Sequence, residues 1–240
     1  MNSSIDKVGV ILLAAGKSTR MSGTDKIIAP INGLPTFLYP LKTLIASNVI
    51  DQISIIASET NISKIKQYLE NWNFPKTTKS IYIHVFVGGK FRQDSVRIGI
   101  ESLSDSDMIV IHDAARPFIT NKMLIQGLHE VKKTGSSTVA IKTTDSMKIV
   151  SSENFSIKSL DRTKIWNIQT PQFFIQKILQ ESHQKTSNTK EIFTDDTSLV
   201  ESQGYQTKIF EGSNTNIKIT TNDDLILAET ILKSGIINNE

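Results

Sequence analysis

Small residues followed by positive charges end the first apolar run of the chain, in the segment L-A-A-G-K-S-T-R-M. Ala14, Ala15 and Gly16 leave the backbone bare, so that its N–H groups can approach a polyphosphate. Arg20 and Lys26 add positive charge beyond the turn. A continuous apolar run bounded by glycine is typical of a parallel strand, and ligands bind at the carboxyl ends of such strands. The segment therefore predicts a phosphate-binding loop.

Two well-known phosphate-binding motifs do not fit this segment. The stretch G-K-S-T resembles the end of a Walker A loop, but Ile11 stands where that motif needs its first glycine. The dinucleotide fingerprint G-x-G-x-x-G fails at Ser18 and Met21. The pattern disfavours a P-loop kinase and removes the main support for a nicotinamide-dependent dehydrogenase.

A glycine pair opens a second candidate binding segment, G-G-K-F-R-Q-D-S. Gly88 and Gly89 follow an apolar run, and Asp94 is placed to cap the helix that follows. Such a loop can press its backbone against a flat ring while Ser95 hydrogen-bonds the edge of the ring. An ordinary capped strand-to-helix turn explains the same residues, and the segment alone does not decide between the two interpretations.

A carboxylate follows the apolar run M-I-V-I in the motif H-D-A-A-R-P. Asp113 is well placed to hold Mg²⁺, which binds through one or two carboxylates together with substrate phosphates. The alternative is a pair between Asp113 and Arg116 that braces the loop. We expect His112, a lone histidine at a strand end, to satisfy a local hydrogen bond.

Three polar positions in the second half of the chain are ambiguous when taken singly. The motifs at Thr170 and Thr194, T-P-Q and T-D-D, each resemble the start of a helix, and helix capping is their favoured explanation. The alternation in N-I-K-I-T places Lys218 on a strand, where a solvated lysine is the ordinary interpretation. Their functional interpretation depends on the other motifs.

Composition limits the classes of protein. With 240 residues, the chain can form one large α/β domain over residues 1–240, and two small domains are the alternative. The absence of cysteine excludes disulfides, iron–sulfur clusters and thiolate sites, and the four histidines have no metal-binding spacing. The net charge of +3, without a basic block, disfavours nucleic acid and suits small anions. No targeting segment or long apolar stretch is evident, so we expect a soluble, cytoplasmic protein with no membrane partner.

Apolar runs alternate with helical patterns, which predicts a mostly parallel sheet with helices on both faces. The predicted strands are 8–13, 52–57, 81–87, 108–112 and 137–142, with 205–210 extended. The predicted helices are 35–47, 61–71, 94–103, 121–133 ending at Gly135, 173–182, 195–202 ending at Gly204, and 223–233. Between them, 146–150 and 154–160 predict a β-hairpin without a covering helix. We expect this arm, at about residues 143–165, to find a partner subunit.

The motifs in this order resemble one family. From Val8 to Glu229, the segments L-A-A-G-K-S-T-R-M, G-G-K-F-R-Q-D-S-V, H-D-A-A-R-P, T-P-Q-F-F, T-D-D-T-S-L-V-E and E-G-S-N-T-N-I-K-I-T are similar to those of the 2-C-methyl-D-erythritol 4-phosphate cytidylyltransferases of the non-mevalonate isoprenoid pathway. These motifs in this order are far more specific than any one of them. The resemblance implies a Rossmann-like nucleotidyltransferase fold and CMP transfer from CTP to methylerythritol phosphate with Mg²⁺.

The resemblance also implies a set of site residues and a partner. At the nucleotide it implies Ala14, Ala15, Gly16, Arg20, Lys26, Gly89, Ser95, Asp113 and Ala114, with Asp113 as the Mg²⁺ ligand. On the side of the acceptor it implies Arg116, Ser146, Arg162, Thr170, Thr194 and Lys218. The arm matches the element with which this family clasps the other subunit, so we expect a homodimer with a shared active site.

The chemistry of the implied reaction suits these residue types. A phosphate monoester has a second pKa of about 6, so it is largely a dianion at pH 7 and can attack phosphorus without a general base. The reaction then needs mainly positive charge. We expect Arg20 and Lys26 to stabilise the transition state and Lys218 to orient the attacking phosphate.

The chain departs from the family pattern at five positions and leaves other functions open. Ser18 replaces a loop glycine, and Asp25 and Ile27 stand where the family usually has proline and glutamine. Lys90 stands where an acidic residue can approach the ribose, and Ser146 replaces a threonine. The alternatives are a ribitol-5-phosphate cytidylyltransferase, disfavoured by Ala115 in H-D-A-A-R-P, and a non-catalytic nucleotide-binding dimer. A nucleic-acid-binding protein is the third.

Overall fold

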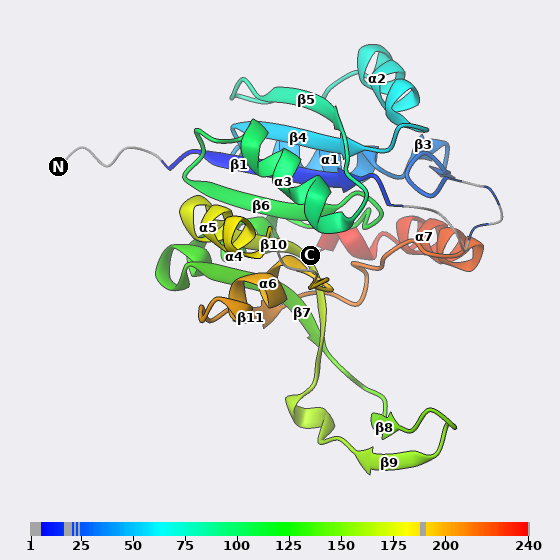
Figure 1. Cartoon of the computed structure of the whole chain (residues 1–240). Coiled ribbons are helices and arrows are strands. Elements are labelled where there is room, and N and C mark those ends of the chain that lie inside the picture. The colour runs from blue at the N-terminus through cyan, green and yellow to red at the C-terminus, as the bar shows by residue number, and fades with distance from the viewer. Residues whose placement is uncertain (1–5, 17–20, 22, 24, 188–190, 240) are drawn as a thin grey trace.

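The protein is built around a seven-stranded sheet with the strand order β11-β7-β10-β6-β1-β4-β5 (Figure 1). The computed structural model describes residues 6–16, 21, 23, 25–187 and 191–239. The strands of the sheet are β1 (Val8–Ala14), β4 (Gln52–Ala57), β5 (Tyr82–Val87), β6 (Met108–Asp113), β7 (Ser136–Lys142), β10 (Trp166–Ile175) and β11 (Lys208–Glu211). Two small hairpins lie outside the sheet: β2 (Pro30–Ile31) with β3 (Leu34–Pro35), and β8 (Lys148–Val150) with β9 (Ser156–Ser159).

Parallel pairing dominates the half of the sheet that carries the first motifs. Strand β1 pairs in parallel with β4 and β6, and β4 pairs in parallel with β5. Every residue of β1, β4 and β6 is buried, because helices cover both faces. The predicted fold class, a mostly parallel sheet between helices, is confirmed.

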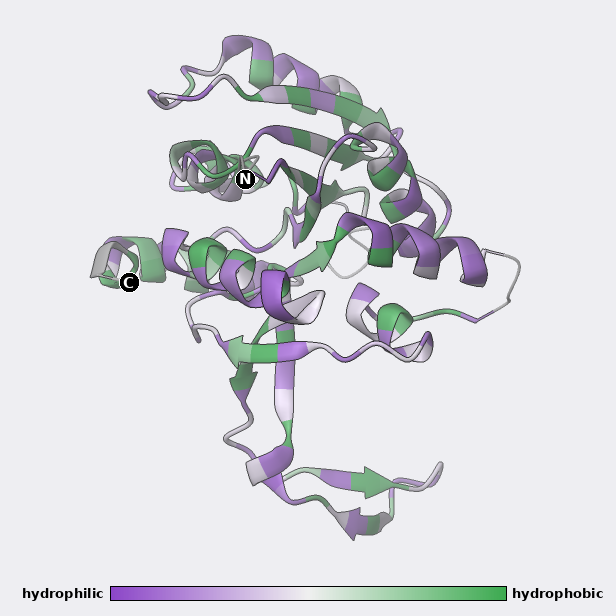
Figure 2. Cartoon of the chain, turned by 90° about the vertical axis from the view of Figure 1, so that its left-hand side faces the viewer, coloured by the Kyte–Doolittle hydropathy of each residue, from purple (hydrophilic) through white to green (hydrophobic). Residues whose placement is uncertain are grey.

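Seven α-helices accompany the sheet. They are α1 (Leu38–Ala46), α2 (Ile62–Asn71), α3 (Arg92–Ser102), α4 (Asn121–Thr134), α5 (Gln176–Thr186), α6 (Asp196–Ser202) and α7 (Asn222–Ser234) in the described part of the chain. Alternate residues of β1 face opposite sides. Val10 and Leu12 join a cluster with residues of α1 and α4, whereas Ile11 and Leu13 join one with α3, α5 and α6. In Figure 2, hydrophobic residues, in green, recur along the strands and on parts of the helices.

The expected helix 173–182 is wrong in its first part. Phe173 and Phe174 belong to β10, which runs antiparallel between β6 and β7, and α5 begins only at Gln176. Both phenylalanine side chains are fully buried, one in the cluster on each face of the sheet. An apolar run of this kind fits a two-sided strand as well as a helix, which explains the error. The expectation that Thr170 opens a helix is wrong for the same reason.

Two smaller expectations also need correction. Helix α3 begins at Arg92 rather than at Asp94, and the Asp94 carboxylate accepts the backbone N–H of Phe91 at 3.0 Å. Asp94 therefore supports the first turn from within it. Residues 216–220 lie in a loop, not on a strand. The predicted cap Gly135 is confirmed, with φ of 81° at the end of α4.

A third apolar cluster joins the C-terminal helix to the loops around the first motif. Met21, Ile31, Phe118, Ile219 and Ala228 are buried together. Ile219 also donates its backbone N–H to the Ala115 carbonyl at 2.8 Å. This packing fixes the loop that carries residue 218 beside the end of β6.

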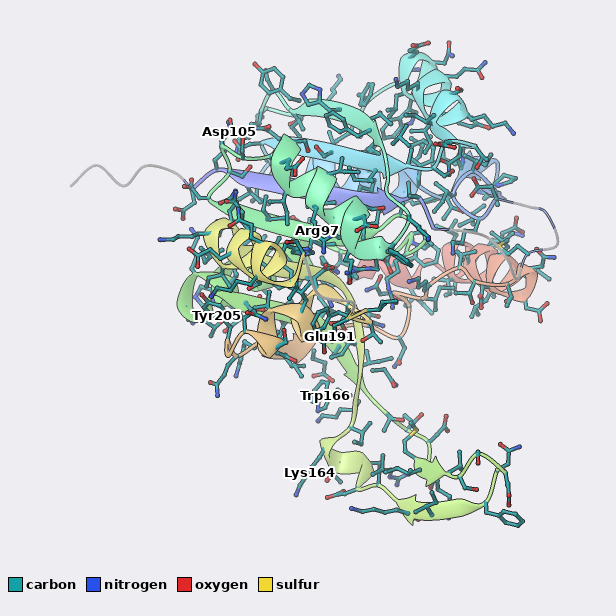
Figure 3. All side chains as sticks on the ribbon, viewed as in Figure 1. Arg97, Asp105, Lys164, Trp166, Glu191 and Tyr205 are labelled. Atoms are coloured by element: carbon teal, nitrogen blue, oxygen red, sulfur yellow. The ribbon has the colours of Figure 1, made fainter. Side chains whose placement is uncertain are left out.

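The hairpin β8–β9 projects away from the sheet as an arm (Figure 1). Lys164, in a short 3₁₀ helix (Arg162–Lys164), and Trp166 mark the place where the chain returns to the sheet (Figure 3). All residues of β8 and β9 are exposed. The predicted hairpin is therefore present within the expected region.

We expect Gly127→Ala to destabilise the fold by about 1–3 kcal/mol, the usual cost of overpacking a core. Helix α4 lies so close to β10 that a methyl group at Gly127 would come within 2.1 Å of the Phe173 ring. Urea unfolding measures the loss. Gln126→Ala, at an exposed site on the same helix, is the control and should change stability by less than about 0.5 kcal/mol. Equal stability of the two variants would contradict the close packing.

Among the described residues, we find no helix with the length and apolar character needed to cross a membrane.

Candidate active site

A cavity of about 320 Å³ opens beside the carboxyl ends of β1, β5 and β6. Its walls bring together segments that are far apart in the sequence. They are formed by Leu13, Ala15, Gly16, Lys26, Ile27, Gly89, Lys90, Phe91, Arg92, Ser95, Asp113, Ala115 and Lys218. The cavity thus lies at the sheet edge where open α/β proteins bind ligands.

The turn after β1 presents bare backbone and a lysine to this cavity. A methyl group at Gly16 would lie 3.6 Å from the Lys26 Nζ atom, so the lysine lies over the glycine. Asn61 donates from its amide to the Ala14 carbonyl at 3.0 Å and to Asp25 at 2.9 Å. Asp25 also accepts the backbone N–H of Ile27 at 2.9 Å. Asp25 and Asn61 therefore hold the lysine segment against the turn.

Asp113 is surrounded by positive charge. Its Oδ2 atom lies 2.6 Å from Lys218 Nζ, and its Oδ1 atom lies 4.0 Å from the Arg92 guanidinium. Burial alone would raise the pKa of Asp113, but the charges of Lys218, Arg92 and Arg116 outweigh it and hold the pKa far below its ordinary value. The carboxylate is therefore ionised throughout the neutral range.

Buried hydrogen bonds fix the backbone behind Asp113. Its N–H donates to the Thr170 hydroxyl at 3.1 Å, and the same hydroxyl lies 3.1 Å from His112 Nδ1. The other ring nitrogen of His112 lies 3.0 Å from the Arg116 carbonyl. Asn216 donates to the Thr170 carbonyl at 2.9 Å. The Asp113 loop, β10 and the loop of Lys218 therefore form one connected network.

The opposite wall comes from the glycine pair and the start of α3. The Gly89 N–H donates to the buried Ser95 hydroxyl at 3.2 Å, and a methyl group at Gly89 would come within 2.3 Å of Asp94. Lys90 lies over the Phe91 ring, with 5.3 Å from Nζ to the ring centroid. The two glycines keep this wall thin, so a flat group can lie against backbone there.

Comparisons with known proteins agree over nearly the whole chain. The family model for 2-C-methyl-D-erythritol 4-phosphate cytidylyltransferase matches residues 8–234. A curated relative of that name from Dehalococcoides mccartyi is 40% identical over 230 residues, which cover 96% of this chain and 98% of the relative. The chain belongs to the 2-C-methyl-D-erythritol 4-phosphate cytidylyltransferase family. The resemblance inferred from the motifs is thereby confirmed.

Further relatives support the assignment to the cytidylyltransferase family. One from Clostridium novyi is 36% identical over 226 residues, or 93% of this chain and 96% of the relative. A solved structure of 4-diphosphocytidyl-2C-methyl-D-erythritol synthase from Anaerococcus prevotii superposes with a TM-score of 0.83 at 26% identity, covering 95% of this chain and 97% of that one. Membership makes the chain a nucleotidyltransferase.

The structure brings most of the predicted nucleotide residues of this family member together. Those that line the cavity are Ala15, Gly16, Lys26, Gly89, Ser95 and Asp113. Ala14 and Ala114 are buried beside it, and the Ala114 N–H donates to the Leu13 carbonyl at 3.0 Å. Arg20 and Ser18 lie outside the described residues.

The predicted acceptor residues divide into two groups. Arg116 and Thr170 lie behind Asp113, with the Arg116 guanidinium donating to the Asn216 carbonyl at 2.7 Å. Thr194 is exposed just before α6, where Asp195 caps the helix by accepting the Ser198 N–H. Ser146 and Arg162 belong to the projecting arm and line no part of this cavity within the described chain. Lys218 is the one predicted acceptor residue that lines the cavity.

Sequence reasoning missed Asn61 and Arg92 as contributors to the site. Asn61 belongs to none of the motifs. Its support of the turn after β1 becomes visible only in the structure, where α2 approaches that turn. Arg92 stands inside the segment G-G-K-F-R-Q-D-S, where its charge was a usable signal. The expectation that His112 is structural is confirmed by its two buried contacts.

We expect stability to fall by about 3 kcal/mol between pH 6.5 and 4 because of His112. Burial lowers the pKa of His112 to about 4, against 6.5 for the free side chain. The unfolded chain therefore binds a proton in this window that the folded chain does not, so acid favours unfolding. The depressed carboxylates Asp113 and Asp196 act at lower pH, below their unfolded pKa of 3.8.

Urea unfolding at a series of pH values measures this effect. The variant His112→Asn should lose most of the change between pH 6.5 and 4, because asparagine does not titrate. An unaltered pH profile in that variant would show that another group is responsible.

Proposed function

We propose that this pocket transfers CMP from CTP to 2-C-methyl-D-erythritol 4-phosphate and releases pyrophosphate, a step of isoprenoid precursor biosynthesis. One observation carries the proposal. The turn at Gly16, Lys26, Lys218 and the ionised Asp113 all line the same cavity. Family membership and the names of the relatives supply the substrates.

The bond changes are those of a single displacement at phosphorus. An oxygen of the acceptor phosphate bonds to the α-phosphorus as the bond to the β-phosphate oxygen breaks and pyrophosphate leaves. The acceptor is already a dianion, so no side chain needs to remove a proton. His112 agrees with this, because it is buried and both its ring nitrogens contact protein atoms.

In this proposal, catalysis comes from positively charged side chains. Lys26 and Arg20 stabilise the charge on the phosphoryl oxygens in the transition state, and Lys218 orients and neutralises the attacking phosphate. The position of Lys26 over Gly16 supports its role, because phosphates cradled by the turn would meet its ammonium group. Gly89 and Ser95, with Lys90 beside them, form the wall proposed to receive the cytosine and ribose.

The residues around Asp113 fit Mg²⁺ bound mainly through substrate. No group of three or more histidine, cysteine or acidic residues within the described chain is arranged to hold a metal ion, and Asp113 is the one carboxylate among the described residues that line the cavity. Mg²⁺ suits such a site, since it keeps water and takes substrate phosphates as ligands. Asp113 would hold the ion, which would supply a Lewis acid that neutralises the triphosphate. Lys218, which is paired with Asp113, would then be available to the acceptor phosphate.

We further propose a homodimer in which the arm reaches the partner. The arm carries exposed apolar side chains that the described chain leaves uncovered, at Met147, Ile149, Val150, Phe155 and Ile157. Arg162 and Ser146 belong to the same arm by their positions in the chain, and the arm projects away from the sheet (Figure 1). They would complete the acceptor side of the other subunit's site.

Pyrophosphate release tests the proposed reaction. The purified protein is given CTP and Mg²⁺ with either methylerythritol 4-phosphate or ribitol 5-phosphate, each with an EDTA control. We expect turnover with methylerythritol phosphate and its loss in EDTA. Preference for ribitol phosphate would assign the other acceptor, and silence with both would favour a non-catalytic nucleotide-binding dimer.

A further inference from the structure

Arg92 lies between two carboxylates at the wall of the cavity. It is the first residue of α3, and its side chain is 30% exposed. One terminal nitrogen forms an ion pair with Asp196, and the other lies 4.0 Å from Asp113 Oδ1. The planar guanidinium group can face two acids at once, whereas a lysine ammonium is a single point of charge.

Asp196 is deeply buried behind this arginine. Its side chain is 2% exposed, and its Oδ1 atom lies 3.5 Å from Nε2 of the equally buried His183. Burial would raise the pKa of Asp196, but the ion pair with Arg92 outweighs it and holds the pKa below its ordinary value. The Asp196 backbone N–H donates to Gln172 of β10 at 3.2 Å. The acid is therefore fixed in place by α5, α6 and the sheet.

The local fold does not require a carboxylate at this position. Asp195 already caps α6, by accepting the Ser198 N–H at 2.8 Å. A buried ion pair gains little stability over apolar residues of similar size, because both charges lose their water. The charge of Asp196 therefore needs another explanation. Its ion-pair partner Arg92 lines the cavity, so a role in the reaction is the explanation we consider.

We propose that Asp196 is a positioning residue for the transfer reaction, and that it holds Arg92 where its second terminal nitrogen faces Asp113 and the nucleotide phosphates. Arg92 then orients the carboxylate of Asp113 from the Oδ1 side, and Lys218 orients it from the Oδ2 side. Arg92 also adds a fixed positive charge that needs no reorganisation when the triphosphate arrives. The inference rests on the proposed function.

A double-mutant cycle with Arg92→Met, Asp196→Asn and both together tests the pair. We expect each single change to lower kcat/KM about 100-fold, the usual scale for one electrostatic group. The double change should be about as damaging as either single one, because the two residues act as a unit. Lys177→Met with Glu181→Gln, an exposed ion pair on α5, is the control and should stay within twofold.

Arg92→Lys separates positioning from simple charge. Lysine keeps the charge but reaches only one acid, so we expect KM for CTP to recover to within a few fold of the original while kcat stays low. A purely structural role would instead lower the thermal midpoint and leave kcat of the folded fraction unchanged.

Three results would overturn the inference. These are additive losses in the cycle, full kcat in Arg92→Lys, or full activity in folded Arg92→Met. The last variant keeps the test decisive if Asp196→Asn fails to fold, since Arg92 lies at the cavity wall. Absence of turnover in the unaltered protein would refute the proposed function itself, whereas unchanged turnover in the variants refutes only the role of this pair.

Discussion

Replacing Asp113 with asparagine is expected to lower kcat/KM about a thousandfold, or about 4 kcal/mol of transition-state stabilisation. The change keeps the size of the side chain but removes the charge between Lys218 and Arg92. The substitution removes the proposed Mg²⁺ ligand, and it leaves the positive side chains of Lys218 and Arg92 without the negative charge that balances them. Both effects act where the triphosphate would bind, which is why we rank this substitution first.

Steady-state kinetics over a range of Mg²⁺ concentrations checks this prediction. Because the amide is a poorer ligand than the carboxylate, the variant should need more Mg²⁺ for half-maximal rate. Asp105→Asn is the matched control, since Asp105 also pairs with a lysine, Lys7, but does not line the cavity. Near-normal turnover of Asp113→Asn with an unchanged Mg²⁺ requirement would contradict its role.

Lys26→Ala is expected to lower kcat about 100-fold while it weakens CTP binding by less than about tenfold. The ammonium group lies over Gly16, in the turn where the phosphates are proposed to lie. If it stabilises mainly the charge that develops on the phosphoryl oxygens, its loss affects the transition state more than the bound substrate.

Steady-state kinetics measures the change in kcat, and calorimetric titration with CTP measures the change in nucleotide affinity. Lys42→Ala on α1, an exposed lysine outside the cavity, should leave both quantities unchanged. Equal losses in kcat and in affinity would show that Lys26 only binds the nucleotide.

The strands at the centre of the sheet could be predicted from sequence because burial on both faces leaves a simple pattern. Residues 52–57 match β4 at both ends, and the predicted ends of the runs of β1 and β6 differ from the observed ends by single residues. The sequence alone therefore predicts that the turn after β1 and the acid at the end of β6 lie at one edge of the sheet. Parallel order alone places both at the carboxyl edge, whereas their position on neighbouring strands follows from the pairing of β1 with β6.

β10 could not be predicted from the same pattern. Its apolar residues run directly into the helical pattern of α5, and a two-sided strand has no period that separates it from a helix. Its antiparallel insertion between β6 and β7 depends on long-range pairing that no local signal carries. This strand brings Thr170 to the Asp113 backbone, so the error affected the interpretation of a site residue.

The supporting network of the site was beyond sequence reasoning for a similar reason. Asn61, Asp196 and His183 reach the site through contacts between elements far apart in the chain. Asp25 interrupts the family pattern in sequence, yet the structure gives it a clear local task, since it accepts bonds from Asn61 and from the Ile27 N–H. Motifs identified the residues that line the cavity, whereas the residues that hold them required the fold.

The most direct test of the account is the stereochemical course of the reaction with CTP that carries a chiral α-thiophosphate. Product from this nucleotide and methylerythritol 4-phosphate is analysed by phosphorus NMR. A single in-line displacement by the acceptor phosphate predicts a cytidylyl product with inverted configuration at the α-phosphorus. Retention would indicate a covalent intermediate on the protein and contradict the account, as would the absence of cytidylyl transfer.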